Sequence, residues 1–155
     1  MSTLAQVIAS LKARDAAMIT MFGTAPSRLV YWDKDEKPVL PNEPAPWVFF
    51  YLETGRPGQP AGYGGGRGQN LYRTDGDLTG LIFLPKGYGL EEHAAYGEHV
   101  AAAFRSHRDS YVSCFGVEPQ PAVDGSSLKP PGLDSEVVNY DCIVVQVPFH
   151  YDHVG

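Results

Sequence analysis

The chain has 155 residues, with 18 acidic and 12 basic side chains and a formal net charge of −6. A chain of this length fits a single domain, which can bury roughly two-thirds of its unfolded surface. The negative charge argues against a dedicated nucleic-acid-binding protein, because such proteins bind phosphates through clustered lysine and arginine. The 17 glycines and 13 prolines predict long loops between the elements of secondary structure.

The sequence predicts a protein made in a reducing cytoplasm, without a membrane partner. Residues 1–15 alternate polar and apolar side chains and lack the apolar core of a signal peptide. No apolar run approaches the ~20 residues that a bilayer-spanning helix needs. In such a compartment Cys114 and Cys142 are expected to be free, buried thiols.

The first element predicted along the chain is an amphipathic helix over residues 4–22. Thr3 and Gln6 fit a capping box before it, and Gly23 is a natural stop after it. Apolar side chains recur at helical spacing between these two signals.

Three strands are predicted in the next part of the chain. The first is short, at residues 28–32, and a polar, proline-rich loop separates it from Trp47–Thr54. This second strand is apolar on both of its alternating faces, which predicts a central strand covered on both sides. The third strand is Leu71–Pro85, and the glycine-rich residues 55–69 before it are then the tip of a long β-hairpin.

A second helix and two more strands complete the prediction. The helix covers residues 90–107, followed by a strand with a ragged end at 110–123, a loop at 124–135 and a long final strand at 136–152. Small residues let the helix pack closely on a sheet. The expected inner stripe of this helix consists of Leu90, Ala94, Gly97, Ala101 and Phe104.

This order of elements predicts one α+β domain over residues 1–155. Its core is a mostly antiparallel β-sheet flanked by two α-helices, with a long Gly-rich β-hairpin. The sequence shows neither an internal repeat nor a second domain.

The glycine-rich stretch does not match known phosphate-binding patterns. Arg67 is followed by Gly68 and Gln69, where a P-loop has lysine and then serine or threonine. A dinucleotide fingerprint also fails, because its third glycine is missing and a strand follows instead of a helix. We therefore expect the glycines to let the chain bend or pass close to a neighbour.

Two acidic pairs, Asp33/Asp35 and Asp75/Asp77, could hold a metal ion, but neither has further acidic ligands at calcium-loop spacing. We interpret them as solvated carboxylates. Asp75-Gly76 also fits a two-residue hairpin turn, but its flanking strands would be short, so a bulged or bent strand is expected there.

The histidines give no clear site either. His150 and His153 flank Asp152, but side chains three positions apart on a strand point to opposite faces, and zinc needs more ligands. The three histidines of the second helix are expected to be solvated: His93, His99 and His107.

No arrangement for nucleophilic catalysis is present in the sequence. The stretch "DGSSL" lacks the second glycine of a G-x-S-x-G elbow, and Cys114 has no basic neighbour in sequence to lower its pKa. We expect neither a catalytic residue, nor a cofactor, nor a metal site.

The order of segments resembles the phage tail terminator proteins of long non-contractile tails and of related gene transfer agents. Three stretches carry this resemblance: "PNEPAPWVFFYLETGRPGQ", "YRTDGDLTGLIFLPKGYG" and "NYDCIVVQVPFHYD". The resemblance implies a structural virion protein rather than an enzyme. It implies a homo-hexameric ring that caps the head-proximal end of the tail tube and stops tube polymerisation.

The same resemblance implies where the protein acts and what it contacts. Its partners would be the tail tube protein and the head–tail connector, and DNA would only pass through the lumen of the ring. Its place would be the head-proximal end of the tail in the virion, after assembly in the host cytoplasm. The hairpin residues expected to contact a neighbouring subunit or the tube are Tyr63, Gly64, Gly65, Gly66, Arg67, Gln69 and Arg73.

Other functions stay open at this point. The nearest alternative is another neck protein, a head-completion or head–tail joining protein, which would bind the portal side rather than the tube. A small enzyme could use a metal at Asp33/Asp35 or at the His150, Asp152 and His153 group. A monomeric binding module could use the glycine-rich loop.

Overall fold

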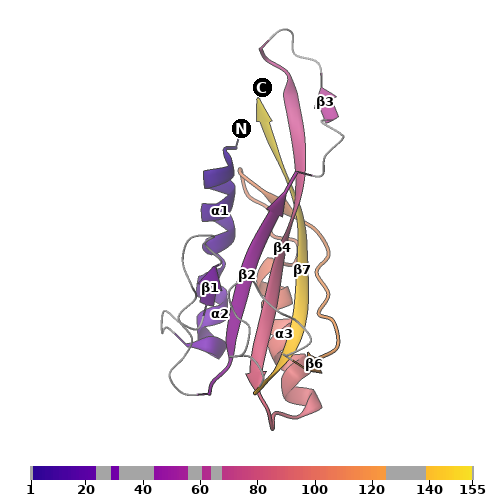
Figure 1. The fold of residues 1–155 in the computed structure, drawn as a ribbon. Helices are drawn as coiled ribbons and strands as arrows, with labels where there is room; N and C mark the ends of the chain where they lie inside the picture. The colour runs from indigo at the N-terminus through magenta and orange to yellow at the C-terminus, as the bar shows by residue number, and fades with distance from the viewer. Residues whose placement is uncertain are drawn as a thin grey trace.

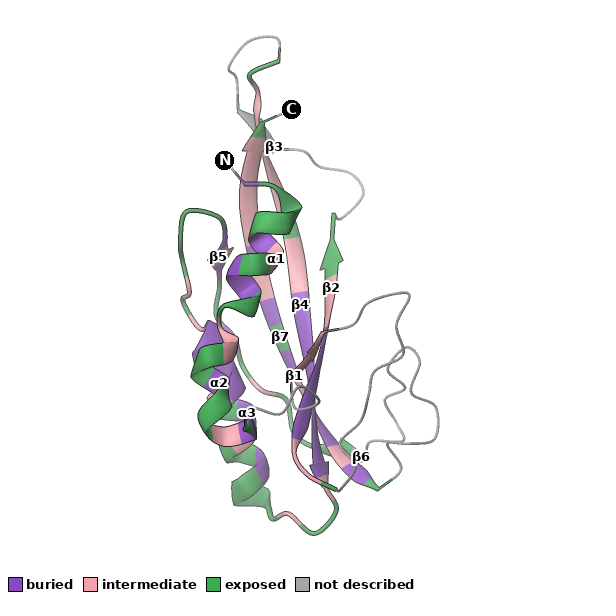
Figure 2. Ribbon diagram, turned by 90° about the vertical axis from the view of Figure 1, so that its left-hand side faces the viewer, coloured by how far each residue is buried: buried purple, intermediate pink, exposed green. Residues whose placement is uncertain are grey.

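The computed structural model describes residues 2–23, 29–31, 44–55, 61–63, 68–124 and 139–154. These residues form one mixed, mostly antiparallel sheet with three helices on one of its faces (Figures 1 and 2). The predicted α+β class is therefore confirmed. No helix within these ranges is long and apolar enough to cross a membrane.

Two long strands form the centre of the sheet. β4 (Leu71–Pro85) and β7 (Tyr140–Val154) are antiparallel and pair over their whole length, from Leu71 opposite Val154 to Pro85 opposite Tyr140. β2 (Trp47–Thr54) pairs antiparallel with the other edge of β4. The shorter strands are β1 (Leu29–Tyr31), parallel to β2; β3 (Ala61–Tyr63), paired with β4; and β5 (Ser113–Cys114) and β6 (Val123–Asp124), both paired with β7.

The strands β2 and β4 have the predicted bounds, and both faces of the sheet are buried along Trp47–Phe50 and Leu78–Leu84. On the helix side, alternating residues such as Val48, Ile82 and Val145 join the main core. On the other side, Trp47 stacks on Phe83 with ring centroids 4.5 Å apart, and both side chains are fully buried. The described part of the chain places no helix on this second face.

The predicted helix over residues 4–22 is two helices, α1 (Leu4–Lys12) and α2 (Asp15–Phe22). The capping box of Thr3 and Gln6 is confirmed. The break lies at Arg14, where the amide bonds back three residues to the Leu11 carbonyl instead of four. The Arg14 side chain reaches across to the last helix and donates from Nε to the Ala103 carbonyl at 3.0 Å. This contact ties the tightened turn to the neighbouring helix.

α3 (Leu90–Phe104) follows β4 directly and packs on the sheet. The predicted inner stripe is right for Gly97, Ala101 and Phe104, which are buried. It is wrong for Leu90, which is 83% exposed, and for the exposed Ala94, because both border the segment 119–122 rather than the core.

The last third of the chain has less strand than predicted. The expected strand at 110–123 reduces to β5, the start of β6 and an isolated bridge between Pro119 and Val145. Pro119 and Pro121 lack the amide hydrogens that a continuous ladder needs. β7 extends to Val154, two residues beyond the prediction.

Gly76 lies inside β4 with a regular register on both sides, so Asp75-Gly76 is neither a hairpin turn nor a bulge. A Cβ at Gly76 would lie 2.5 Å from the Phe149 ring and 2.8 Å from the Glu53 carbonyl oxygen. Any larger residue at this position would clash with the buried Phe149 ring, so glycine is required.

Replacing Gly76 by alanine is expected to lower the free energy of unfolding by about 1–3 kcal/mol, because an inserted methyl must displace a core ring and a neighbouring strand. Urea unfolding followed by circular dichroism measures this loss. Gly116→Ala is the matched control, since no atom lies within 4 Å of a Cβ there, and its effect should stay within about 0.5 kcal/mol. Equal stability of the two variants would contradict this packing.

Candidate interaction surface

The two central strands continue past the end of β2, and there the short strand β3 pairs with residues 71–73 of β4. β2 pairs with residues 76–83 of β4, whereas β4 and β7 stay paired from Leu71 opposite Val154 onward. We call residues 71–75 and 150–154 the arm. At about 3.3 Å per residue, it extends roughly 17 Å beyond β2, at the end of the sheet where both termini lie (Figure 1).

One face of the arm is charged. Arg73 lies directly opposite Asp152 and donates from Nε and Nη2 to the two carboxylate oxygens at 2.8 and 3.0 Å. These bonds, together with the positive charge of Arg73, lower the pKa of Asp152. In the next pair, Asp75 faces His150, whose ring packs against Phe115 at 4.8 Å.

The opposite face of the arm is aromatic. The rings of Tyr72 and His153 stack with centroids 5.8 Å apart, and Tyr151 lies 5.6 Å from His153. Leu4 and Val154 border the same region and are about two-fifths exposed. The arm therefore offers a protein partner one charged face and one aromatic face.

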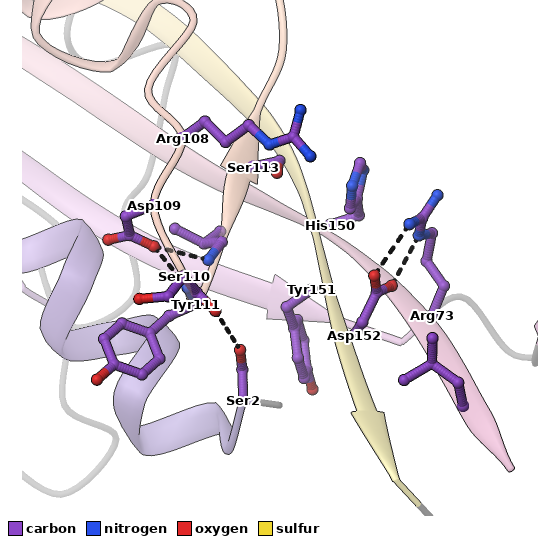
Figure 3. Close-up of a pocket in the computed structure, with 12 residues that line it drawn as sticks. Ser2, Arg73, Arg108, Asp109, Ser110, Tyr111, Ser113, His150, Tyr151 and Asp152 are labelled. Carbon is purple, nitrogen blue, oxygen red and sulfur yellow. Dashed lines mark hydrogen bonds and ion pairs between the residues drawn. The ribbon is translucent and has the colours of Figure 1, made fainter.

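A polar pocket of about 280 Å³ lies between the arm and the turn at residues 108–113 (Figure 3). Ser2 lines this pocket and donates its backbone amide hydrogen to the Asp152 carbonyl at 2.9 Å. Arg108 and His150 project from the other side, next to the Arg73–Asp152 pair. Burial, with help from Arg73 and Arg108, lowers the pKa of His150 despite the opposing charges of Asp152 and Asp75.

The predicted interface residues fall partly on this surface. Arg73 is on the charged face of the arm, Tyr63 ends β3 opposite Leu71, and Gln69 is exposed just before β4 begins. Gly64, Gly65, Gly66 and Arg67 lie outside the described residues. The structure thus brings the neighbourhood of the predicted hairpin to the arm, although the hairpin tip itself is not described.

A serine, a histidine and an aspartate meet elsewhere, between α1 and the turn after α3. Ser10 Oγ donates to Asp109 Oδ2 and lies 3.3 Å from His107 Nε2. A hydrolase triad needs the histidine to bridge serine and aspartate through its two nitrogens. Here the same nitrogen faces both partners, and Nδ1 contacts Arg14 instead at 3.3 Å. The cluster is a structural tie between two segments.

The tie depends on Asp109. Its Oδ1 accepts the amide hydrogens of Tyr111 and Val112 at 2.7 and 2.9 Å, which fixes the turn that lines the pocket. Burial acts to raise the pKa of Asp109, but the bonds from Ser10 and these amides, with nearby His107, outweigh it and lower the pKa.

Among the described residues, the side chains weighed as metal ligands are not brought together. His150 and His153 lie on opposite faces of β7, as predicted, and Asp152 is bound by Arg73. Asp75 and Asp77 lie two positions apart on β4, and Asp33 and Asp35 lie outside the described residues. Across the described ranges, no three His, Cys, Asp or Glu side chains are placed to hold a metal ion.

The burial of His93 on α3 was not predicted from the sequence. His93 is 9% exposed rather than solvated, and its Nε2 lies 3.5 Å from Asp141 Oδ2. The signal was available, because His93 is four residues before Gly97 and seven before Val100, on the buried side of the helix.

A scan of the chain against models of known protein families gives no match, and a search of curated proteins gives no relative.

Replacing Asp109 by alanine is expected to lower the free energy of unfolding at pH 7 by about 1–3 kcal/mol, because two amides and a hydroxyl lose their acceptor. The folded-state pKa is lowered, so the charged carboxylate stabilises the fold above its unfolded pKa of about 3.9. That contribution disappears as the pH falls through the folded value.

Urea unfolding between pH 2.5 and 7 should therefore show the gap between wild type and Asp109→Ala closing below about pH 4. Glu118→Ala, at an exposed position outside the helices, is the control, and its effect should stay within about 0.5 kcal/mol across this range. A gap that is constant over this range would contradict the role given to the charge.

Cys114 and Cys142 are free and buried, as predicted. Burial raises the pKa of Cys114 to about 11 and that of Cys142 to about 12. We expect no reaction of the folded protein with Ellman's reagent at pH 8 within minutes, and two thiols per chain in denaturant. Rapid reaction of the folded protein would contradict this burial.

Proposed function

We propose that the chain is a structural virion protein, the tail terminator of a phage or gene transfer agent with a long non-contractile tail. In this proposal six copies form a ring on the head-proximal end of the tail tube. The ring stops the addition of tube subunits and presents a surface to the head–tail connector. DNA passes through its lumen without being bound.

The arm is the observation that carries this proposal beyond the sequence resemblance. A narrow extension of the sheet past the body of a small domain presents two side-chain faces, here with β3 paired along one edge. Its tyrosines and Arg73 are residue types that are enriched where protein surfaces meet, which suits contacts with a neighbouring subunit. A ring needs such heterologous contacts, in which different surfaces of two copies meet and the rotation closes.

The chemistry of the described residues supports assembly better than catalysis. The Ser10 cluster lacks the geometry of a triad, the thiols are buried with raised pKa values, and the pocket beside the arm offers hydrogen bonds but no activated nucleophile. The net charge of −6 suits a conduit, because it repels phosphate weakly and limits adhesion of DNA.

The direct test is the mass of the assembly, measured by native mass spectrometry with and without the tail tube protein of the same virus. The proposal predicts a species of about six chains, either alone or once tube protein is added. A strict monomer that ignores the tube protein contradicts it. Binding to the portal-side connector alone would instead identify another neck protein.

The arm can be tested in the same assay. Arg73→Glu opposes Asp152 with a like charge on the charged face of the arm, and should weaken ring formation while α-helical and β-sheet circular dichroism stays unchanged. Bulky replacements of Gly64, Gly65 and Gly66 should do the same if the hairpin contacts a neighbour. Rings and tubes of normal length from both variants would contradict a role for this end of the molecule.

A further inference from the structure

A groove of about 520 Å³ lies at the end of the sheet opposite the termini, between α3 and the segment 119–122. Figure 1 shows α3 and β6 together at this end, far from the arm. The volume falls in the range of roughly 300–1,000 Å³ that is typical of ligand sites. Neither the terminator proposal nor the cluster around Ser10 uses it.

The groove is apolar and one of its ends is closed. Its floor is Ile143, which is 2% exposed, and its walls are Leu90 and Ala94 on α3 and prolines on the facing segment. Gly97 lets α3 approach the facing segment closely, since a Cβ there would lie 2.9 Å from Pro119. Leu90 is the most exposed large apolar side chain among the described residues, at 83%.

A single polar group is buried in this apolar lining. His93 borders the groove, and its Nε2 has no hydrogen-bond partner within the described ranges, although Asp141 lies 3.5 Å away. Buried polar atoms without partners are rare in folded proteins. This nitrogen is buried and faces Asp141, so it adds no accessible hydrogen-bonding group to the groove.

Acidic side chains border the groove. Helix α3 carries three glutamates and no lysine or arginine, and Glu98 lines the groove. Glu118 precedes the lining residue Pro119, Asp141 lies beside His93, and Arg105 pairs with Glu98 at 2.6 Å. A second copy of this chain would bring its own acidic side chains to this surface and be repelled, so a basic partner is favoured.

We infer that this groove binds a segment of a partner protein in which an apolar side chain is flanked by lysine or arginine. The apolar side chain fills the space above Ile143, and the carboxylates pair with the flanking cations. The inference does not rest on the terminator proposal, because the groove lies at the opposite end from the arm.

A random dodecapeptide library, displayed on messenger RNA and selected against the immobilised full chain, supplies the probe. The best peptide is then synthesised and its dissociation constant measured by fluorescence polarisation. Ala94→Lys should weaken binding at least about tenfold, since it puts volume and a like charge into the groove. Ala95→Lys is the matched control, because Ala95 is equally exposed but does not line the groove, and it should leave affinity unchanged.

The inference predicts selected peptides with an apolar residue between lysines or arginines, and affinity that falls with salt. It is overturned if no peptide is enriched, if enriched peptides are acidic or uncharged, or if both variants bind equally. It is also overturned if sedimentation shows self-association of wild type that Ala94→Lys abolishes, because a second copy then fills the groove. The mass of the assembly tests the terminator proposal and peptide binding tests the groove, so either proposal can fail without the other.

Discussion

The pairing of β4 with β7 is the constraint on which the rest of the structure depends. Fifteen residues of each strand run antiparallel in one unbroken register. β2 adds to one edge of this pair and β5 and β6 to the other, and the helices pack on one of its faces. Because β4 and β7 are longer than the strands beside them, one end of this strand pair extends beyond the rest of the sheet. The arm is therefore a direct consequence of strand length.

The two ends of the molecule differ in chemistry as a result. At the arm, only half-buried residues cover the ladder, and an Arg73–Asp152 ion pair crosses it in partial contact with solvent. Such exposed pairs contribute little stability, about 0–1 kcal/mol, which leaves them available for exchange with a partner's charges. At the other end, Trp47 stacks on Phe83 on one face of the sheet, and the apolar groove beside α3 lies on the other face.

The sequence allowed good predictions where burial leaves a simple pattern. Trp47–Thr54 and Leu71–Pro85 were predicted with the bounds observed, because each contains a run of apolar residues that is covered on both faces. The break at Arg14 was not predictable, since it depends on a carbonyl of α3 that is distant in sequence. The same is true of Leu90, whose exposure follows from the position of the prolines at 119 and 121 rather than from its own helix.

The candidate surface was predictable only in part. Arg73 was singled out from its place beside the glycine-rich stretch, but its pairing with Asp152 requires the register of β7, which no local pattern contains. The cross-strand stack of Tyr72 on His153 and the position of His93 beside Asp141 are also products of tertiary contact. Sequence reasoning identified the region of the chain, and the sheet register defined the surface.

The central claim is that the arm is the surface through which copies of the chain assemble. Amide hydrogen exchange of the free protein and of the protein mixed with tube protein tests it residue by residue. The account predicts faster exchange in residues 71–75 and 150–154 of the free chain than in residues 78–84, because the arm is less buried. It predicts strong added protection of the arm amides in the assembly. Unchanged exchange in the arm, with new protection confined to other surfaces of the molecule, would contradict it.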